Sequence, residues 1–378
     1  MTERQEQDAA TSPARPLHVG WFADEDTLGT FARVLGPLAV GLADDLVTIT
    51  LFRICGAGGD DVFGPGVETV RYRTRRLFGP GAAAVAELAG KVRSGKMDLL
   101  HALDASSAGL VAQVAREAGT TYAVSSHATG DGARLGTLGA DCAAVLASSA
   151  TIRKDLIVHH VSAADKVHLF PPGVYHVRTP TCFGETGRSA AVVAGGPMES
   201  ASPWQSVLRT FAELRLREFD CVFFIMASGR GAHKTHRLAR QLDLLGQVTF
   251  VDEQVASQFA GIVKAADVYI SAAPSGTVNV RTLVALANGS AVLAAEDPTA
   301  DFIIDGQTAL VFDPGNPAEL TTKLVAILDD PGAARALAGV ALAYVAEHHS
   351  PAAAVAALSS IYRSAAAEFD QATRQDRT

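Results

Sequence analysis

Residues 265–296 read AADVYISAAPSGTVNVRTLVALANGSAVLAAE, and this stretch decides the fold. Two short apolar runs flank a turn and a longer apolar segment. Short apolar runs rich in β-formers favour buried strands, whereas Pro, Ser and Gly together favour a turn. We therefore predict a strand, a turn, a buried helix and a second strand, over residues 267–271, 274–276, 280–287 and 291–295.

Both ends of the predicted helix carry local signals. Asn288 and Gly289 should terminate it, because glycine adopts the left-handed conformation without a Cβ clash. At the helix start, free backbone N–H groups form a natural anion site. The candidate ligand-binding residues at this start are Ser275, Gly276, Thr277 and Asn279.

The composition describes a well-cored soluble protein. The chain has 378 residues, which favours two domains. Apolar residues make up 48% of it and charged residues 19%. A formal charge of −8 argues against a nucleic-acid partner bound through its phosphates. No apolar run reaches membrane-spanning length, and residues 1–16 are polar without an apolar signal core.

The cysteines add a prediction about the compartment. They are scattered without metal-ligand spacing, at positions 55, 142, 182 and 221. We expect reduced structural thiols in a cytoplasmic protein, with no bound metal and no cofactor.

Strand and helix patterns alternate along the chain, which predicts an α/β fold with parallel sheets. Ligands of such sheets bind beyond the carboxyl ends of the strands. We divide the chain into a disordered tail (1–16), a first Rossmann-like domain (17–174), a linker (175–188), a second Rossmann-like domain (189–348), and a last helix with its tail (349–378).

The stretch at 265–296 resembles the donor-binding core of the retaining GT-B glycosyltransferases of group 1, a large nucleotide-sugar family. That family's pattern is Pro-Ser, then Glu-Gly-Phe-Gly, then a helix with a second Glu eight positions after the first, ending in Ala-X-Ala-X-Gly-X-X-Val. Gly276 and Val284 stand where the two glutamates belong. The resemblance covers about 17–369 and is stronger in the second domain. The matching residues are Pro274, Ser275, Ala285, Ala287, Gly289 and Val292.

The resemblance implies two Rossmann-like domains facing one cleft, with the last helix crossing back onto the first domain. It also implies transfer of a sugar from a nucleotide-sugar donor to an acceptor, with retention of anomeric configuration and without a metal. The family holds the donor diphosphate with an Arg and a Lys, where this chain has Gly196 and Ala201. Arg230 and Lys234, after the next strand, are the candidate replacements. Asp252 replaces a glycine in the loop that lines the family's nucleobase pocket.

The first domain carries the acceptor side and its candidate residues. His101 and His127 resemble the histidines of the family's Asp-X-X-His-X-His and Thr-X-His strand ends. His127 is the stronger catalytic candidate, because Gly130 and Gly132 beside it let a ligand approach the backbone; a structural role is the alternative for both. The acidic turn at 24–26 either caps the following helix or recognises a cationic or hydroxyl-rich acceptor.

A basic cluster follows the third predicted strand, at Arg71, Arg73, Arg75 and Arg76. It is either a solvated surface or a peripheral contact with an anionic membrane or phosphate. No transmembrane segment is expected in either case.

Three hypotheses for the function follow. The first is a glycosyltransferase acting on a nucleotide-sugar donor and an unidentified acceptor. The second is a catalytically degenerate pseudoenzyme that binds a ligand or activates a partner glycosyltransferase, as the two missing glutamates suggest. The third is an enzyme for a different donor, whose phosphate is held by Arg230, Lys234 and the amides of residues 275–277.

Overall fold

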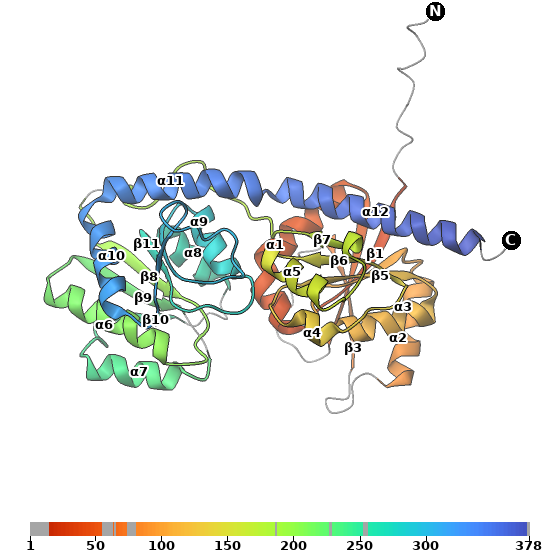
Figure 1. Ribbon diagram of the computed structural model, residues 1–378, viewed down its shortest axis with the longest axis horizontal. Coiled ribbons are helices and arrows are strands. Elements are labelled where there is room, and N and C mark those ends of the chain that lie inside the picture. Colours follow the sequence, from red (N-terminus) through yellow and green to blue (C-terminus); the bar gives the residue numbers. More distant parts are fainter. Residues whose placement is uncertain are drawn as a thin grey trace, which may run out of the picture.

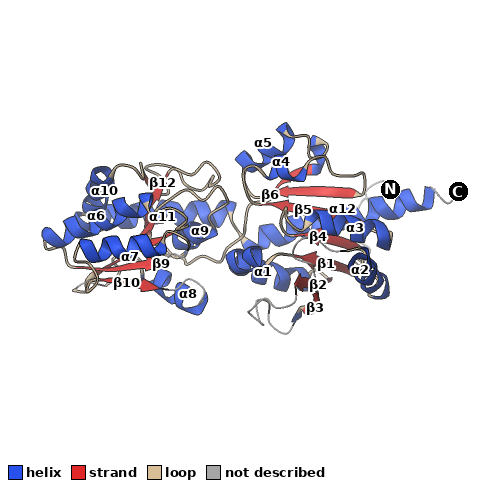
Figure 2. Ribbon diagram, turned by 90° about the horizontal axis from the view of Figure 1, so that it is seen from below, coloured by secondary structure: helices blue, strands red, loops and turns tan. Residues whose placement is uncertain are grey.

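The computed structural model describes residues 15–54, 63, 66–73, 81–185, 187–226, 229–251 and 256–375. It contains two separate parallel sheets with flanking helices (Figures 1 and 2), as predicted. Asp252, Cys55, Arg75, Arg76 and most of the N-terminal tail lie outside the described residues. No helix in the described ranges is long and apolar enough to cross a membrane.

The N-terminal sheet has the strand order β3-β2-β1-β4-β5-β6-β7. The order reverses direction between β1 and β4, so the loops after these two strands diverge and leave a crevice at their carboxyl ends. Its strands are β1 (Leu17–Phe22), β2 (Val47–Ile54), β3 (Glu68–Tyr72), β4 (Leu99–Ala102), β5 (Thr121–Ser126), β6 (Cys142–Ala147) and β7 (Val167–Leu169). Its helices are α1 (Glu25–Asp44), α2 (Ala82–Ser94), α3 (Ala108–Ala118), α4 (Asp131–Leu135) and α5 (Ala150–Val158).

The C-terminal sheet has the order β10-β9-β8-β11-β12-β13, with its reversal between β8 and β11. Its strands are β8 (Ala190–Gly195), β9 (Cys221–Met226), β10 (Val248–Val251), β11 (Val268–Ser271), β12 (Ala291–Ala295) and β13 (Leu310–Phe312). The helices of this half are α6 (Ser202–Leu216), α7 (Ala232–Gln241), α8 (Ala256–Ala265), α9 (Val280–Ala287), α10 (Pro317–Asp329) and α11 (Pro331–His348).

The stretch at 265–296 forms β11, α9 and β12, which confirms the predicted order of elements. All of α9 except Arg281 is buried, because its side chains are apolar on nearly every face. Gly289 follows the helix with φ +75°, and a Cβ there would lie 2.8 Å from Pro180 Cα. The helix end therefore needs glycine both for its conformation and for its close packing.

The last helix, α12 (Pro351–Gln375), crosses from the C-terminal domain onto the N-terminal one (Figure 1). Tyr362 anchors it there: its hydroxyl receives a hydrogen bond from Trp21 Nε1 at 2.8 Å and lies 2.6 Å from His101 Nδ1. The series of hydrogen bonds ends at Ser125, whose Oγ lies 2.9 Å from His101 Nε2.

His101 lies at the end of β4 as expected, but its side chain is buried and both ring nitrogens have protein partners, which favours the structural role that the sequence left open. Burial lowers the pKa of His101 to about 3, so the imidazole is neutral at pH 7.

Candidate functional site

The two domains touch through the loops that follow β5 and β11. Thr129 N–H donates to the Gly276 carbonyl at 3.0 Å, and Val278 N–H donates to the His127 carbonyl at 2.8 Å. Ala128 and Thr277 thereby form an isolated antiparallel bridge. The structure thus brings the His127 loop and the 275–279 loop directly together at the carboxyl ends of the two sheets.

A second contact between the domains lies nearby. The carboxylate of Asp301, from the C-terminal domain, accepts the N–H of Ala150 at 2.6 Å at the start of α5. Burial raises the pKa of Asp301. A carboxylate at a helix N-terminus is favourably placed in the field of the helix, so this bond supports the approach of the domains.

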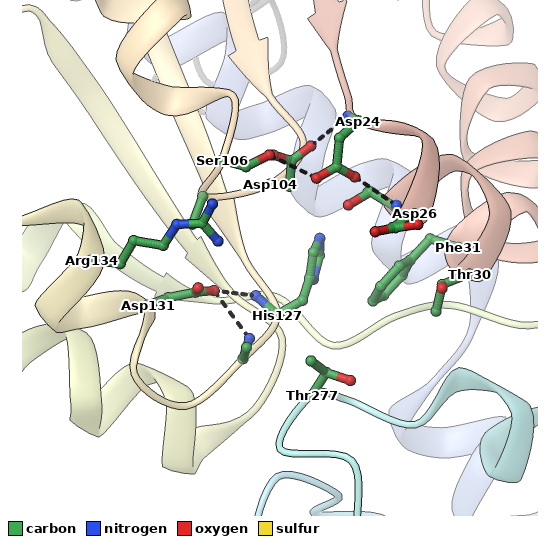
Figure 3. Close-up of a pocket in the computed structure, with 13 residues that line it drawn as sticks. Asp24, Asp26, Thr30, Phe31, Asp104, Ser106, His127, Asp131, Arg134 and Thr277 are labelled. Atoms are coloured by element: carbon green, nitrogen blue, oxygen red, sulfur yellow. Dashed lines mark hydrogen bonds between the residues drawn. The ribbon is translucent and has the colours of Figure 1, made fainter. Parts of the chain in front are cut away.

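A hollow of about 170 Å³ lies beside the bridge, and we call it the acidic hollow (Figure 3). It opens beyond β1, β4 and β5, at the reversal of the N-terminal sheet, where ligands of such sheets bind. It is lined by Asp24, Asp26, Thr27, Thr30, Phe31, Asp104, Ala105, Ser106, His127, Ala128, Asp131, Arg134 and Thr277.

The carboxylates in and beside the acidic hollow make different contacts. Asp24 accepts the Thr27 N–H at 2.8 Å and caps α1, which confirms the capping interpretation for this residue. Glu25 turns away and pairs with the buried Arg53 at 3.0 Å. Asp104 accepts the Asp24 N–H at 2.9 Å and so ties the loops after β1 and β4 together. Asp26 is exposed and lines the hollow.

His127 lines the hollow with both ring nitrogens already engaged. Nε2 lies 2.9 Å from the Leu103 carbonyl, an acceptor only, so Nε2 carries the proton. Nδ1 then accepts from Ser148 Oγ at 2.5 Å. The ring stacks on Phe31 at a centroid distance of 4.1 Å, and burial lowers its pKa. His127 therefore presents a neutral ring of fixed orientation, whose proton is held by the protein.

The start of α9 is also satisfied internally. Asn279 Oδ1 accepts the Thr282 N–H at 3.1 Å and caps the helix. The buried carboxylate of Asp297 accepts the Ser275 N–H at 3.2 Å, while Ser275 Oγ accepts the Thr277 N–H at 3.3 Å. An anion at this helix start would have to displace these partners and lie beside the Asp297 charge.

Gly276 and Val284, at which the resemblance places the family's two glutamates, have different surroundings. Gly276 has φ +68° and is exposed in the bridging loop. Val284 is only 6% exposed and belongs to the core. A glutamate at position 276 would have to adopt a left-handed backbone conformation. A glutamate at position 284 would place its carboxylate in the apolar core.

Arg230 and Lys234 lie apart from Ser275, in a second hollow of about 500 Å³ that we call the cationic hollow. Arg230 Nε donates to Glu199 Oε2 at 2.9 Å, and both side chains are largely exposed. We expected one site for Arg230, Lys234 and the 275–279 loop; of that loop, Thr277 lines the acidic hollow, whereas Arg230 and Lys234 line the cationic hollow. The cationic hollow is lined by Glu199, Ser200, Ala201, Ser202, Gln205, Arg230, Gly231 and Lys234.

Two helices begin at the cationic hollow, α6 and α7. Their N-cap residues, Ala201 and Gly231, form no side-chain hydrogen bond to the helix. At α6, Ser200 Oγ accepts the Ser202 N–H at 3.2 Å and Pro203 has no N–H, so this start contributes little. At α7, the Gly229 carbonyl accepts the Ala232 N–H, and the next N–H groups of the first turn carry the positive end of the helix dipole. Together with Arg230 and Lys234 they make the hollow suited to a phosphate group.

Sequence reasoning did not single out Asp104, Asp131, Ser106 or Arg134. Asp104 follows β4 by two residues, just as Asp24 follows β1, and this strand-end position was the available signal. Asp131 accepts the backbone N–H groups of His127 and Ala128, which no local pattern indicates. Within the described ranges, no group of three or more His, Cys, Asp or Glu side chains is arranged to hold a metal ion.

Comparisons with known proteins place the fold. Solved structures that resemble nearly the whole chain include a glycosyltransferase from Rickettsia africae, with 12% identity, a TM-score of 0.71, and coverage of 93% of this chain and 99% of that one. Anabaena HepE in complex with UDP and glucose follows, with 15% identity, a TM-score of 0.69, and coverage of 90% and 98%. The sucrose-phosphate synthase of Thermosynechococcus elongatus has 18% identity, a TM-score of 0.66, and coverage of 92% and 98%.

Two family models match the sequence itself, whereas a search of curated proteins finds no match. The model "Glycosyl transferase 4-like domain" matches residues 29–173, and the model "Glycosyl transferases group 1" matches residues 191–330. One match falls on each parallel sheet, in the order that the fold requires. The chain therefore belongs to the group 1 GT-B glycosyltransferases.

Proposed function

We propose that this protein transfers a sugar, with retention of configuration, from a nucleoside-diphosphate donor whose phosphates bind in the cationic hollow. The observation that carries the proposal is that Arg230, Lys234 and the start of α7, which has no side-chain cap, line one hollow. Both family cations are missing at Gly196 and Ala201, so the negative charge of a leaving diphosphate needs another source of stabilisation. The structure of HepE with UDP supports a donor of this class.

The acceptor side of the proposal is the acidic hollow. Asp26 and the Asp104–Ser106 loop offer oxygen acceptors to hydroxyl or ammonium groups. Thr277 of the other domain lines the same hollow, so an acceptor there lies at the meeting point of the two domains. His127 would orient the acceptor with its neutral ring, because its proton is already donated to Leu103.

A second candidate function is a binding module without transfer activity, and the bridge between the domains favours it. The Thr129–Gly276 and Val278–His127 hydrogen bonds lie where the family's first glutamate would meet the transferred sugar. A sugar at that place requires these bonds to open. The missing carboxylates remove two charge-assisted hydrogen bonds, each worth about 1.5–3 kcal/mol, so transfer should be slow even for a donor that binds.

The test of the donor site is calorimetry with UDP and GDP on a set of single variants. Arg230→Ala and Lys234→Ala should each weaken nucleotide binding by roughly 10- to 100-fold, since each removes a charge-assisted bond to phosphate. Glu199→Gln should tighten binding, because it frees Arg230 from its present partner. The matched control is Arg237→Ala, an exposed arginine of α7 that does not line the cationic hollow. Equal affinities for all four variants would refute the phosphate site.

Transfer is then tested separately from binding. Donor hydrolysis is followed with UDP-sugars and GDP-sugars, with and without a hydroxylated amine acceptor. Nucleotide binding together with turnover supports the transferase. Binding in the cationic hollow without any turnover supports the binding module instead.

A further inference from the structure

Helix α7 exposes a face that is made almost entirely of basic side chains. Its ten residues, AHKTHRLARQ, contain no acidic residue. Thr235 and Ala239 are buried against the domain, one turn apart. On a helix of 3.6 residues per turn, the remaining exposed positions lie on the opposite side. That exposed face consists of His233, Lys234, His236, Arg237, Arg240 and Gln241.

Three of these six side chains are lysine or arginine and carry a full positive charge at pH 7. Among the described residues, Lys234, Arg237 and Arg240 form no ion pair, although the chain as a whole carries a formal charge of −8. His236 is held flat against Phe250 at a centroid distance of 3.7 Å, so the helix surface is fixed to the sheet beneath it. A concentrated cationic face on an acidic protein indicates an anionic partner.

The shape of the face selects the kind of partner. The cationic side chains are spread along an outward, convex helix and do not converge on one point, so the face fits an extended array of negative charges. Figure 1 shows α7 at the edge of the C-terminal domain that lies opposite α11, free of other helices on its outer side. A bound peptide would need apolar pockets for its side chains, whereas the hollow nearby, at the start of α7, is lined mostly by polar residues.

We propose that the basic face of α7 docks the protein on an anionic phospholipid surface. The inference does not rest on the proposed sugar transfer: of the three cations of the face, only Lys234 also lines the cationic hollow, and Arg237 and Arg240 do not. The exposed face has no apolar side chain to insert, so the contact is electrostatic and reversible. Docking would hold the hollow at the start of α7 close to the membrane surface.

The experiment is co-sedimentation of the full chain with vesicles. Vesicles of phosphatidylcholine with about one third phosphatidylglycerol should bind the protein, and vesicles of phosphatidylcholine alone should not. Binding should disappear as salt is raised towards ~1 M, where the Debye length falls to about 3 Å. Absence of binding to the anionic vesicles at low salt would overturn the proposal.

Paired variants locate the contact. The double variant Arg237→Gln, Arg240→Gln should bind anionic vesicles about 30-fold more weakly, as expected for the loss of two surface cations. The control Lys154→Gln, Arg178→Gln makes the same change of net charge at exposed positions on α5 and in the linker, and should bind normally. Equal weakening in both double variants would show a general charge effect and refute docking through α7. Unchanged thermal unfolding of both shows that each is folded.

Discussion

The Tyr362 hydroxyl holds the C-terminal helix on the N-terminal domain, and its removal gives the sharpest test of the fold. Trp21 and Tyr362 are each 0% exposed, and His101 is 1% exposed. The hydroxyl accepts the Trp21 N–H at 2.8 Å and donates to His101 Nδ1 at 2.6 Å. Tyr362→Phe keeps the ring and deletes only the group that both neighbours use.

The expected loss of stability follows from these contacts. Without the hydroxyl, the indole N–H of Trp21 and one imidazole nitrogen of His101 stay buried without a partner. Each buried unsatisfied group costs about 1–3 kcal/mol, so Tyr362→Phe should lower the free energy of unfolding by about 2–6 kcal/mol. A domain has a net stability of roughly 5–15 kcal/mol, so the effect should be plainly measurable.

The chain offers a clean assay, because its two tryptophans lie in different domains. In a Trp204→Phe background, the fluorescence of Trp21 reports urea unfolding of the N-terminal domain alone. The matched control is Tyr344→Phe, whose exposed hydroxyl donates to the Asp301 carbonyl at 3.3 Å and should change stability little. If Tyr362→Phe shifted the unfolding free energy by no more than the control, the hydrogen-bonded anchor would be refuted.

Three further predictions concern stability. His101 has a pKa of about 3 in the folded protein and about 6.5 in the unfolded chain, so the unfolded state binds more protons between these values. The free energy of unfolding should therefore fall as pH drops from about 6.5 towards 3. Urea titrations should show a smaller fall for His101→Gln than for the parent protein. Asn279→Ala removes the cap on Thr282 and should cost about 1 kcal/mol in calorimetric unfolding. Asp267→Asn breaks the buried ion pair with Arg188 and weakens the hydrogen bonds that the carboxylate accepts from two backbone N–H groups. It should lower the free energy of unfolding by about 3 kcal/mol, and a loss below ~1 kcal/mol would contradict this role.

Much of the fold was determined by the sequence alone, because its signals are local. The apolar runs of 265–296, the Gly289 helix end and the Asp24 cap each act within a few residues, and each appears as predicted. The alternation of such units implied two parallel sheets, and the residues around 274–292 pointed to the family. These inferences need no knowledge of which strands become neighbours.

The tertiary structure alone decided which strand ends meet. Strand order put β1, β4 and β5 side by side, and so gathered Asp24, Asp104 and His127 around one hollow from positions far apart in the chain. It also placed Arg230 in one hollow with Ser200, because β8 and β9 are neighbours and the loops after them are joined by the Gly231 N–H, which donates to the Met198 carbonyl at 2.6 Å. Tyr362 reaches Trp21 across 341 positions only because α12 crosses back. Such contacts depend on packing between segments far apart in the sequence, whereas helix and strand propensities and capping signals act only within a few residues.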